Sequence, residues 1–443
     1  MSWWIVCDVV MADASHSPER GPGRDHGGAE ESDIAMTIGE LGAAMLDAGY
    51  AVTDVQQVLR ATAGTRAFGV DITIGVLPSA ILIDDSRAGR TRLFNAGGGQ
   101  LTFDQVARVA EIARAVQDGN GSLHDARADL RRVRGSRARF PRPVAVLGSG
   151  LMSAGIAVVF RTTWWAVVLD FVLAVVVGGA LIYGRRLERL MAVLPFLTAF
   201  AVSAVVYALA TELQSGAVTL FVVCAPLVIL IPGATITTGV VELAAGDVVS
   251  GGGRFVSGLI LWATLAVGIA AGAAVVNVPA GSVNGAPVAV VPGWAVLPAV
   301  VLLALGVGLF FDASWSLTGV LVVVLTVTYG IVAVTQLVTT APVASGLAAA
   351  VMLPLLRSLE VRQPRWPAAV TFRPAFWLLV PGSLGLVAIT QVSSNGAQPA
   401  GPALLASVVA TVVAIAVGVQ IGAVLSAFIP MRSAGGIPGG RHR

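Results

Sequence analysis

Ten apolar segments follow one another between residues 144 and 428, and several of them are close to the length of a membrane-spanning helix. A helix of ~20 apolar residues crosses a bilayer, and the absence of water there leaves helices and closed barrels as the only spanning structures. The chain is 56% hydrophobic and 12% charged, whereas soluble proteins are about 25% charged. The sequence therefore predicts an all-α polytopic membrane protein. The expected spans are 144–160, 163–183, 191–211, 217–240, 255–276, 294–311, 315–336, 341–356, 368–392 and 403–428.

Two of these segments are interrupted by a Pro-Gly step, Pro232-Gly233 in the fourth and Pro381-Gly382 in the ninth. Within each half of the membrane part, the interrupted span follows three spans and precedes one more. The ten helices therefore form one five-helix unit that occurs twice. A unit with an odd number of spans inserts its second copy in the opposite orientation. Inverted repeats with matched broken helices are typical of secondary transporters, and the breaks point to the binding site. The sequence predicts transport.

The arginines between the spans set the expected orientation. Only Arg161 and the acidic Glu212 fall on the side opposite the polar N-terminal region. By the positive-inside rule, both termini are expected in the cytoplasm. The arginines on the N-terminal side are Arg185, Arg186, Arg189, Arg254, Arg357, Arg362, Arg365, Arg432, Arg441 and Arg443.

Residues 34–135 are polar enough to form a separate cytoplasmic α+β domain. Short strands are expected at 70–76, 80–83 and 91–94, and amphipathic helices from Thr102 and from Ser122 to Val133. This region has no obvious chemistry, so we expect it to gate or assemble the membrane part. The predicted divisions are a disordered tail (1–33), the α+β domain (34–135), the first repeat (136–276), an external linker (277–293), the second repeat (294–430) and a cytoplasmic tail (431–443).

The residue types that are missing exclude several functions. The chain has no lysine, which removes a Walker A lysine and a lysine Schiff base. Cys7 and Cys224 are its two cysteines, and its four histidines have no ligand spacing, so we expect no disulfide, metal or cofactor. Arginines at the membrane face account for the basic charge, so we expect no nucleic-acid partner. The glycine runs 97–99 and 251–253 lack the phosphate-loop spacing and are expected to be turns.

The two Pro-Gly steps are the candidate substrate site. A break leaves backbone carbonyls and N–H groups unpaired inside the membrane, where they can bind an ammonium and a carboxylate. The alternative is a kink that serves helix packing, with the hydroxyls bonded back to the helix. The candidate substrate-binding residues are Pro232, Gly233, Thr235, Thr237, Thr238, Pro381, Gly382 and Ser383.

Charged residues near the breaks are candidates for coupling to protons. Asp170 lies well inside the second span, where it either carries a proton or sits near the external interface. Glu242 and Asp247 follow the first break and either relay protons, pair with Arg254, or belong to a solvated loop. Arg373 either reaches out to the interface or, like Arg254, is an anion clamp.

The chain resembles the threonine/serine exporter family in its fused form with ten membrane spans, over roughly residues 36–430. The matching stretches lie in the first helix, the strand region and both broken spans. They are Leu41-Gly42 with Gly49-Tyr50, Asp71 to Asp85, Ile231-Pro232-Gly233 running to Leu243-Ala244-Ala245-Gly246-Asp247-Val248-Val249-Ser250-Gly251, and Leu379-Val380-Pro381-Gly382-Ser383.

The resemblance implies a carrier in the cytoplasmic membrane that exports small amino acids and is powered by the proton gradient. Relatives split between two proteins are associated with dicarboxylate export, so a succinate-like substrate stays open. A membrane-anchored sensor or hydrolase is the alternative of another class, but it needs no pair of matched broken helices, and we expect no enzyme. The expected partners are a small amino acid, protons and the lipid bilayer, while assembly into a homo-oligomer is left open.

Overall fold

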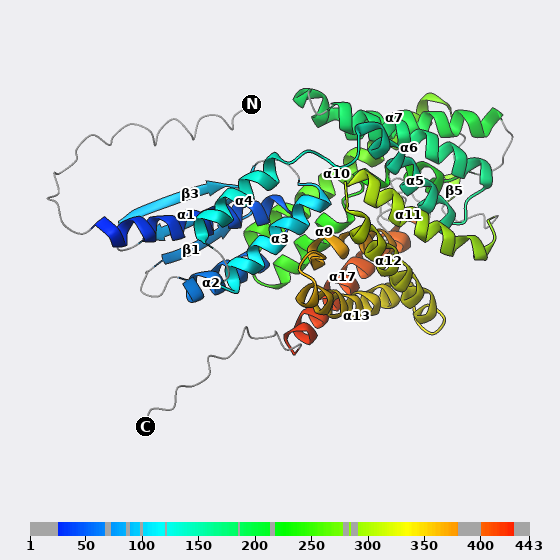
Figure 1. Ribbon diagram of the computed structural model, residues 1–443. Coiled ribbons are helices and arrows are strands. Elements are labelled where there is room, and N and C mark those ends of the chain that lie inside the picture. The colour runs from blue at the N-terminus through cyan, green and yellow to red at the C-terminus, as the bar shows by residue number, and fades with distance from the viewer. Residues whose placement is uncertain are drawn as a thin grey trace.

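The computed structural model of the protein describes residues 25–66, 72–85, 89–97, 101–119, 122–184, 187–212, 218–277, 283–284, 291–379 and 400–428. It has two parts (Figure 1). The smaller, N-terminal part combines helices with three strands, and the larger part is built from helices. This division agrees with the predicted order of a strand-containing region followed by membrane spans.

The N-terminal part contains four helices and an antiparallel sheet with the strand order β1-β2-β3. The three predicted strands are confirmed, with Leu77 and Ala80 paired across the turn between β1 and β2. The elements are α1 (Asp25–Asp47), α2 (Val52–Arg66), β1 (Ile72–Leu77), β2 (Ala80–Asp85), β3 (Arg90–Asn95), α3 (Phe103–Gln117) and α4 (Leu123–Gly135).

Helix α1 is the centre of this part, and it contacts α2, α3, α4 and the sheet. Its apolar residues recur at helical spacing, and Ile38 and Leu41 are fully buried. Strand alternation turns Ile81 and Ile83 toward the same core, where both are at most 1% exposed. Gly42 permits the close approach, because a Cβ there would lie 2.9 Å from Ile81.

Capping side chains fix the starts of α3 and α4 where the sequence predicts them. Thr102 and Gln105 form a reciprocal capping box at α3, and Ser122 accepts a hydrogen bond from the backbone N–H of His124 at α4. The start of α1 differs from the prediction. This helix begins at Asp25, inside the segment predicted to be a disordered tail, where the residues lack a helical apolar period.

The larger part contains eight described helices that are long and apolar enough to cross a membrane. A ninth span is counted if the bent pair of helices at 220–230 and 233–244 is one span. The eight helices are α5 (Arg142–Val159), α6 (Trp164–Gly184), α7 (Glu188–Glu212), α10 (Val248–Val275), α11 (Val296–Phe310), α12 (Trp315–Thr335), α13 (Ala341–Arg362) and α17 (Ala400–Ala427).

The predicted ninth span is described only in its first half. It consists of three short elements, α14 (Ala368–Thr371), η3 (Arg373–Ala375) and α15 (Phe376–Leu379). The second Pro-Gly step, with Pro381, Gly382 and Ser383, lies outside the described residues. Two short strands, β4 (Val218–Thr219) and β5 (Val283–Asn284), pair in parallel next to the spans.

Two helices in the larger part are longer than predicted. Helix α10 begins at Val248, so the glycine run 251–253 is helical and the predicted turn is wrong. The physical reason is the N-cap, because the Asp247 carboxylate accepts a hydrogen bond from the backbone N–H of Ser250. Helix α13 continues past residue 356 to Arg362 and carries Arg357 and Glu360 in its last turns.

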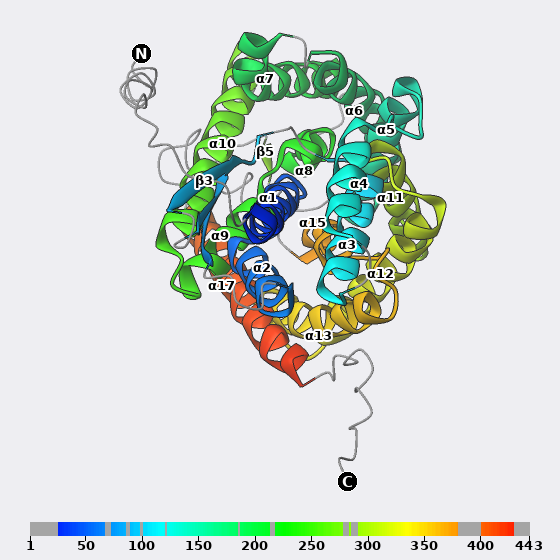
Figure 2. The same ribbon diagram turned by 60° about the vertical axis from the view of Figure 1, so that its left-hand side comes forward.

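Small residues let the long helices pack closely, as is typical inside membranes. A Cβ at Gly306 of α11 would lie 2.7 Å from the backbone oxygen of Gly148 on α5. Gly272 brings α10 against α7 in the same way, and Gly346 brings α13 against α17. The long helices are arranged around α8 (Leu220–Cys224) and α15 (Figure 2).

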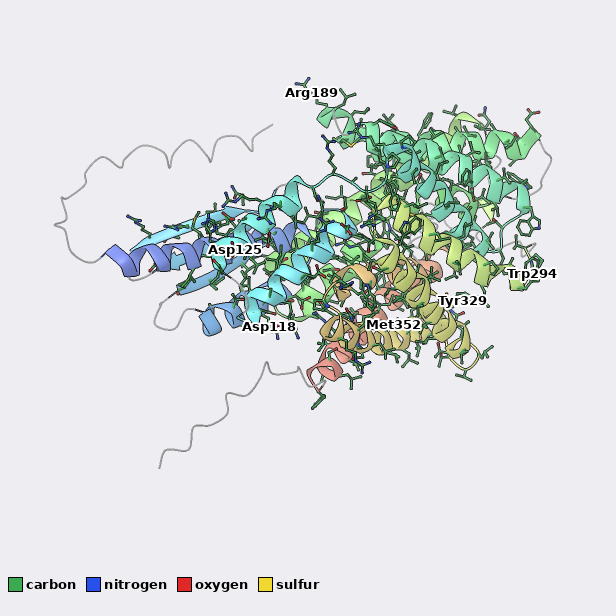
Figure 3. All side chains as sticks on the ribbon, in the orientation of Figure 1. Asp118, Asp125, Arg189, Trp294, Tyr329 and Met352 are labelled. Atoms are coloured by element: carbon green, nitrogen blue, oxygen red, sulfur yellow. The ribbon has the colours of Figure 1, made fainter. Side chains whose placement is uncertain are left out.

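The two ends of the larger part differ in chemistry. Trp294 is 73% exposed and lies at the end far from the N-terminal part, whereas Asp118 and Asp125 belong to the N-terminal part (Figure 3). Exposed tryptophans are typical of the membrane interface. At the near end, the backbone N–H of Phe103 donates to the carbonyl oxygen of Phe311, so the N-terminal part docks directly on the turn between α11 and α12.

Candidate functional site

The first Pro-Gly step is a sharp break in the fourth span. Helix α8 continues as the 3₁₀ helix η1 (Ala225–Leu230). The axis of the next helix, α9 (Gly233–Ala244), is bent by 66° from the axis of this first segment. Pro232 cannot donate a backbone hydrogen bond, so the helix ladder ends there. Pro232 and Gly233 are both buried, so the bend lies within the packed interior.

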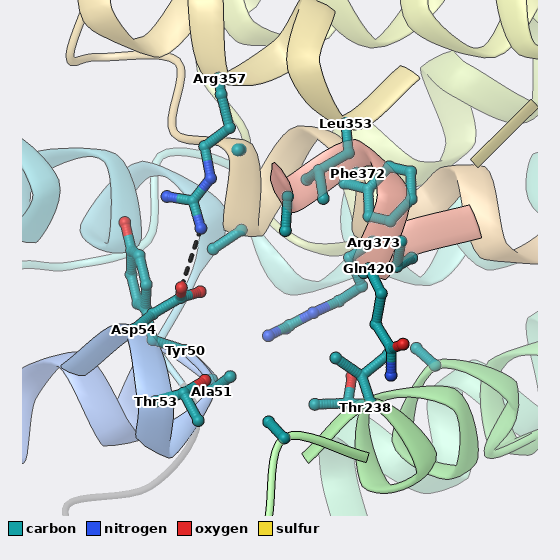
Figure 4. A pocket seen from close by; sticks show the side chains of 18 of the residues that line it. Tyr50, Ala51, Thr53, Asp54, Thr238, Leu353, Arg357, Phe372, Arg373 and Gln420 are labelled. Atoms are coloured by element: carbon teal, nitrogen blue, oxygen red, sulfur yellow. Dashed lines mark hydrogen bonds and ion pairs between the residues drawn. The ribbon is translucent and has the colours of Figure 1, made fainter. Parts of the chain in front are cut away.

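A cavity of about 420 Å³ lies beside α9 (Figure 4). Its walls come from α9, α13, α17 and the α14–α15 segment, and its last wall is the turn between α1 and α2 of the N-terminal part. The first described half of the predicted ninth span thus borders the same cavity as the second half of the fourth. This volume falls within the about 300–1,000 Å³ of small-molecule sites.

The three predicted threonines lie in different surroundings. Thr238 lines the cavity, whereas Thr235 is exposed on another face of α9. Thr237 is fully buried, and its hydroxyl has no hydrogen-bond partner within the described part of the chain. Of the three, only Thr238 therefore reaches the cavity.

Arg373 points into the cavity, toward the N-terminal part of the protein. In Figure 4 its side chain extends between the α1–α2 turn, marked by Ala51 and Thr53, and the pair of Thr238 and Gln420. Its guanidinium donates a hydrogen bond to the backbone oxygen of Ala48 at 3.2 Å. The η3 turn and its neighbours aim this side chain inward, which the spacing along the sequence could not reveal.

Sequence reasoning missed the ion pair that shares this cavity. The Arg357 guanidinium lies 2.9 Å from a carboxylate oxygen of Asp54 and 3.5 Å from one of Glu360. Asp54 and Arg357 are 303 residues apart, so no local motif signals their contact. In the sequence analysis, Arg357 was used only to predict the orientation of the spans. Asp54 lies in the first turn of α2.

Tyr50 supplies a neutral hydroxyl to the same wall. Burial, with a smaller contribution from the negative charge of Glu360, raises the pKa of the Tyr50 phenol. A phenol with a raised pKa keeps its proton at neutral pH. Tyr50 therefore remains a hydrogen-bond donor and brings no charge to the cavity.

Glu242 joins the N-terminal part to the membrane helices. Its side chain is fully buried, with carboxylate oxygens 3.1 Å from Nε of Arg254 and 2.9 Å from the hydroxyl of Ser250. The backbone N–H of Val52, at the start of α2, donates to it at 3.1 Å. The predicted pairing with Arg254 is present for Glu242, and its burial contradicts the solvated-loop alternative for this residue. Asp247 is the N-cap of α10.

Asp170 is a buried carboxylate in the first third of α6. It is 0% exposed, and neither of its carboxylate oxygens has a hydrogen-bond partner among the described residues. Its side chain therefore faces other helices of the protein, whichever depth in the membrane it occupies. Cys224, where α8 passes into η1, interacts electrostatically with Asp170. Asp170 thus lies next to the half of the broken span that precedes the Pro-Gly step.

Ser153 adds a second polar group at this depth. On the neighbouring α5, Gly150 faces Phe171 and Val175 of α6. Because the two helices are antiparallel neighbours, this register sets Ser153 level with Asp170. The Ser153 hydroxyl also lacks a hydrogen-bond partner within the described ranges. Unpaired buried polar groups are uncommon in proteins and call for an explanation.

Comparison with known proteins identifies the family. The family model for threonine/serine exporters matches residues 36–276, which include the N-terminal part, Asp170 and the first broken span. A threonine/serine exporter from Corynebacterium glutamicum is 23% identical over 255 residues, covering 54% of this chain and 50% of that protein. The chain thus spans about half the length of this relative, and no solved structure matches. The chain belongs to the threonine/serine exporter family.

Proposed function

We propose that this protein exports small amino acids, such as threonine and serine, across the cytoplasmic membrane and is driven by the proton gradient. The observation that carries the proposal is the cavity between α9 and the α14–α15 segment. Both segments belong to spans that carry a Pro-Gly step, at Pro232-Gly233 and Pro381-Gly382. The printed name of the relative, a threonine/serine exporter, supports the substrate class.

The substrate is proposed to bind beside the broken spans. Thr238 offers a hydroxyl, and the start of α9 has no side-chain cap, so its first backbone N–H groups favour an anion. Ser383 and the backbone around Gly382 are proposed to complete the site from the second repeat. Arg373 is proposed as the anion clamp, whereas Arg254 is engaged by Glu242.

Asp170 is proposed to carry the coupling proton. Its carboxylate is buried and has no hydrogen-bond partner in the described part of the chain, and Cys224 lies close to it in the first half of the broken span. A carboxylate inside a membrane is costly as an ion, so such residues commonly bind protons in transporters. Glu242 and Asp247 already accept hydrogen bonds from neighbouring groups, which supports structural roles for both.

Two inverted five-helix repeats, with both termini in the cytoplasm, are proposed for the membrane part. The first helices of the two halves, α5 and α11, pack on each other. Within each half the third helix packs on the fifth, α7 on α10 and α13 on α17. This matched pairing supports the repeat. The docking of the N-terminal part near Arg254, Arg357 and Arg365 supports an arginine-rich cytoplasmic face.

Counterflow in proteoliposomes tests the proposal. We expect labelled threonine and serine to exchange, and a pH gradient to drive net threonine transport. Gly233→Leu fills a buried break and should abolish exchange, whereas Gly319→Leu, which adds its side chain in open space on α12, should not. Asp170→Asn should keep exchange and lose the response to the pH gradient.

The possible outcomes separate the alternatives. Exchange of succinate without exchange of threonine would replace the amino-acid exporter by a dicarboxylate carrier. Normal exchange in the Gly233→Leu protein would show that the break is a packing kink. An unchanged response to the pH gradient in the Asp170→Asn protein would remove Asp170 from coupling.

A further inference from the structure

We propose that the substrate site is shared between the membrane helices and the N-terminal part. Arg373 binds the carboxylate of an α-amino acid, and the α1–α2 turn, from Gly49 to Asp54, binds its ammonium group. This inference rests on the proposed transport of amino acids and names the groups that recognise the substrate. It gives the N-terminal part a direct role in binding.

Among the charged side chains that line the cavity, Arg373 is the one that forms no ion pair with another described residue. Three charged side chains line it, Asp54, Arg357 and Arg373. Asp54 and Arg357 neutralise each other at 2.9 Å, and Arg357 also has Glu360. Arg373 has only the backbone oxygen of Ala48 as its partner among the described residues. One bound carboxylate would balance its charge and occupy the remaining donors of its guanidinium.

The walls on both sides of Arg373 offer groups for the rest of an amino acid. The hydroxyls of Thr53 and Thr238 and the amide of Gln420 form no hydrogen bond with other described residues, although all three line the cavity. Only one carboxylate oxygen of Asp54 is engaged by Arg357. Its second oxygen is available to accept from an ammonium group, and the nearby hydroxyls and the amide can bind a side-chain hydroxyl.

The α1–α2 turn is held in place from both sides of the cavity. Arg373 bonds the carbonyl of Ala48, and Glu242 accepts from the N–H of Val52. Between them, Gly49 has a φ of +82°, and a Cβ there would collide with the guanidinium of Arg373. Only glycine permits both the turn and this contact at low cost. The conformation of the α1–α2 turn and the position of the Arg373 side chain therefore depend on each other.

Equilibrium binding of labelled threonine to the full-length protein, purified in detergent without any gradient, tests the carboxylate contact. Arg373→Gln should weaken binding at least tenfold, because a hydrogen bond to a charged group contributes about 1.5–3 kcal/mol. Arg373→Lys should restore part of the affinity through its charge. Arg362→Gln, at an exposed arginine at the end of α13, is the matched control and should bind normally. Threonine amide, which lacks the carboxylate, should not compete.

A thiol-protection experiment tests the contribution of the N-terminal part. Thr53→Cys in a Cys7→Ser background provides a labelling site in the cavity wall, while the native Cys224 is buried. Threonine should slow labelling when Arg373 is present and should have no effect when Arg373→Gln is added. Labelling that threonine leaves unchanged in a protein that still binds threonine would overturn the shared site.

These outcomes are separable from failure of the proposed function. Arg373-dependent binding and protection in a protein that does not transport threonine would uphold the site and refute the exporter. Normal counterflow and normal binding in the Arg373→Gln protein would refute the shared site and uphold the exporter. Competition by threonine amide as strong as that by threonine would remove the carboxylate from recognition.

Discussion

At the scale of single residues, Glu242 is one of the contacts that hold the junction between the two parts. It is buried, accepts hydrogen bonds from Ser250 and from the backbone N–H of Val52, and forms an ion pair with Arg254. Glu242→Gln keeps the shape but removes the charge opposite Arg254, and its amide N–H₂ cannot accept a hydrogen bond. We expect the free energy of unfolding to fall by about 1–3 kcal/mol, the usual cost of leaving a buried polar group unsatisfied. Thermal unfolding in detergent would measure the change.

The matched control is Glu212→Gln, because Glu212 is exposed at the end of α7. We expect the Glu212→Gln protein to unfold at the same temperature as the unchanged protein. Limited proteolysis should cut the N-terminal part faster in the Glu242→Gln protein, since the hold on the start of α2 is lost. Equal unfolding temperatures for the two variants would contradict a structural role for Glu242.

At the scale of elements, the crossing of α9 and α10 depends on one glycine of the run 251–253. A Cβ at Gly251 would lie 2.5 Å from the backbone nitrogen of Leu243 and 2.6 Å from the backbone oxygen of Gly239. Gly251→Val must therefore push α9 away from α10, and overpacking of this kind costs about 1–3 kcal/mol. Gly252 meets nothing within 4 Å, so Gly252→Val is the control. We expect a lower unfolding temperature and less monodisperse protein for Gly251→Val only.

At the scale of the whole molecule, the proposed topology sets the two ends of α13 on opposite sides of the membrane. Val338 is 84% exposed in the turn before α13, and Gln363 is exposed directly after it. In a protein with Cys7 replaced by serine, we expect Val338→Cys to react with an impermeant thiol reagent from outside. Gln363→Cys, which lies on the face of the N-terminal part, should react only after the cells are opened. Reaction of both from one side would refute the five-plus-five arrangement.

The local elements of this protein were determined by the sequence itself. Periodicity identified the strands, the length of the apolar segments identified most of the long helices, and cap residues such as Thr102 and Ser122 located helix starts. The Pro232-Gly233 step identified the break, because proline ends a helix whatever surrounds it. These signals were sufficient because they depend on neighbours along the chain. Helix ends were less certain, as α10 shows, where the Asp247 cap overrode a glycine run.

Only the tertiary structure decided how the charged side chains combine. From the sequence, Arg373 was predicted to be an interface residue or an anion clamp. In the folded protein its side chain points into a cavity that Thr238, Gln420 and the α1–α2 turn also line. The fold also brought Asp54 to Arg357, across 303 residues. Side-chain direction and burial depend on which helices pack together, and that packing is set by distant surfaces rather than by local spacing. A charge pattern therefore predicts which residues can bind, and the packing determines which of them meet.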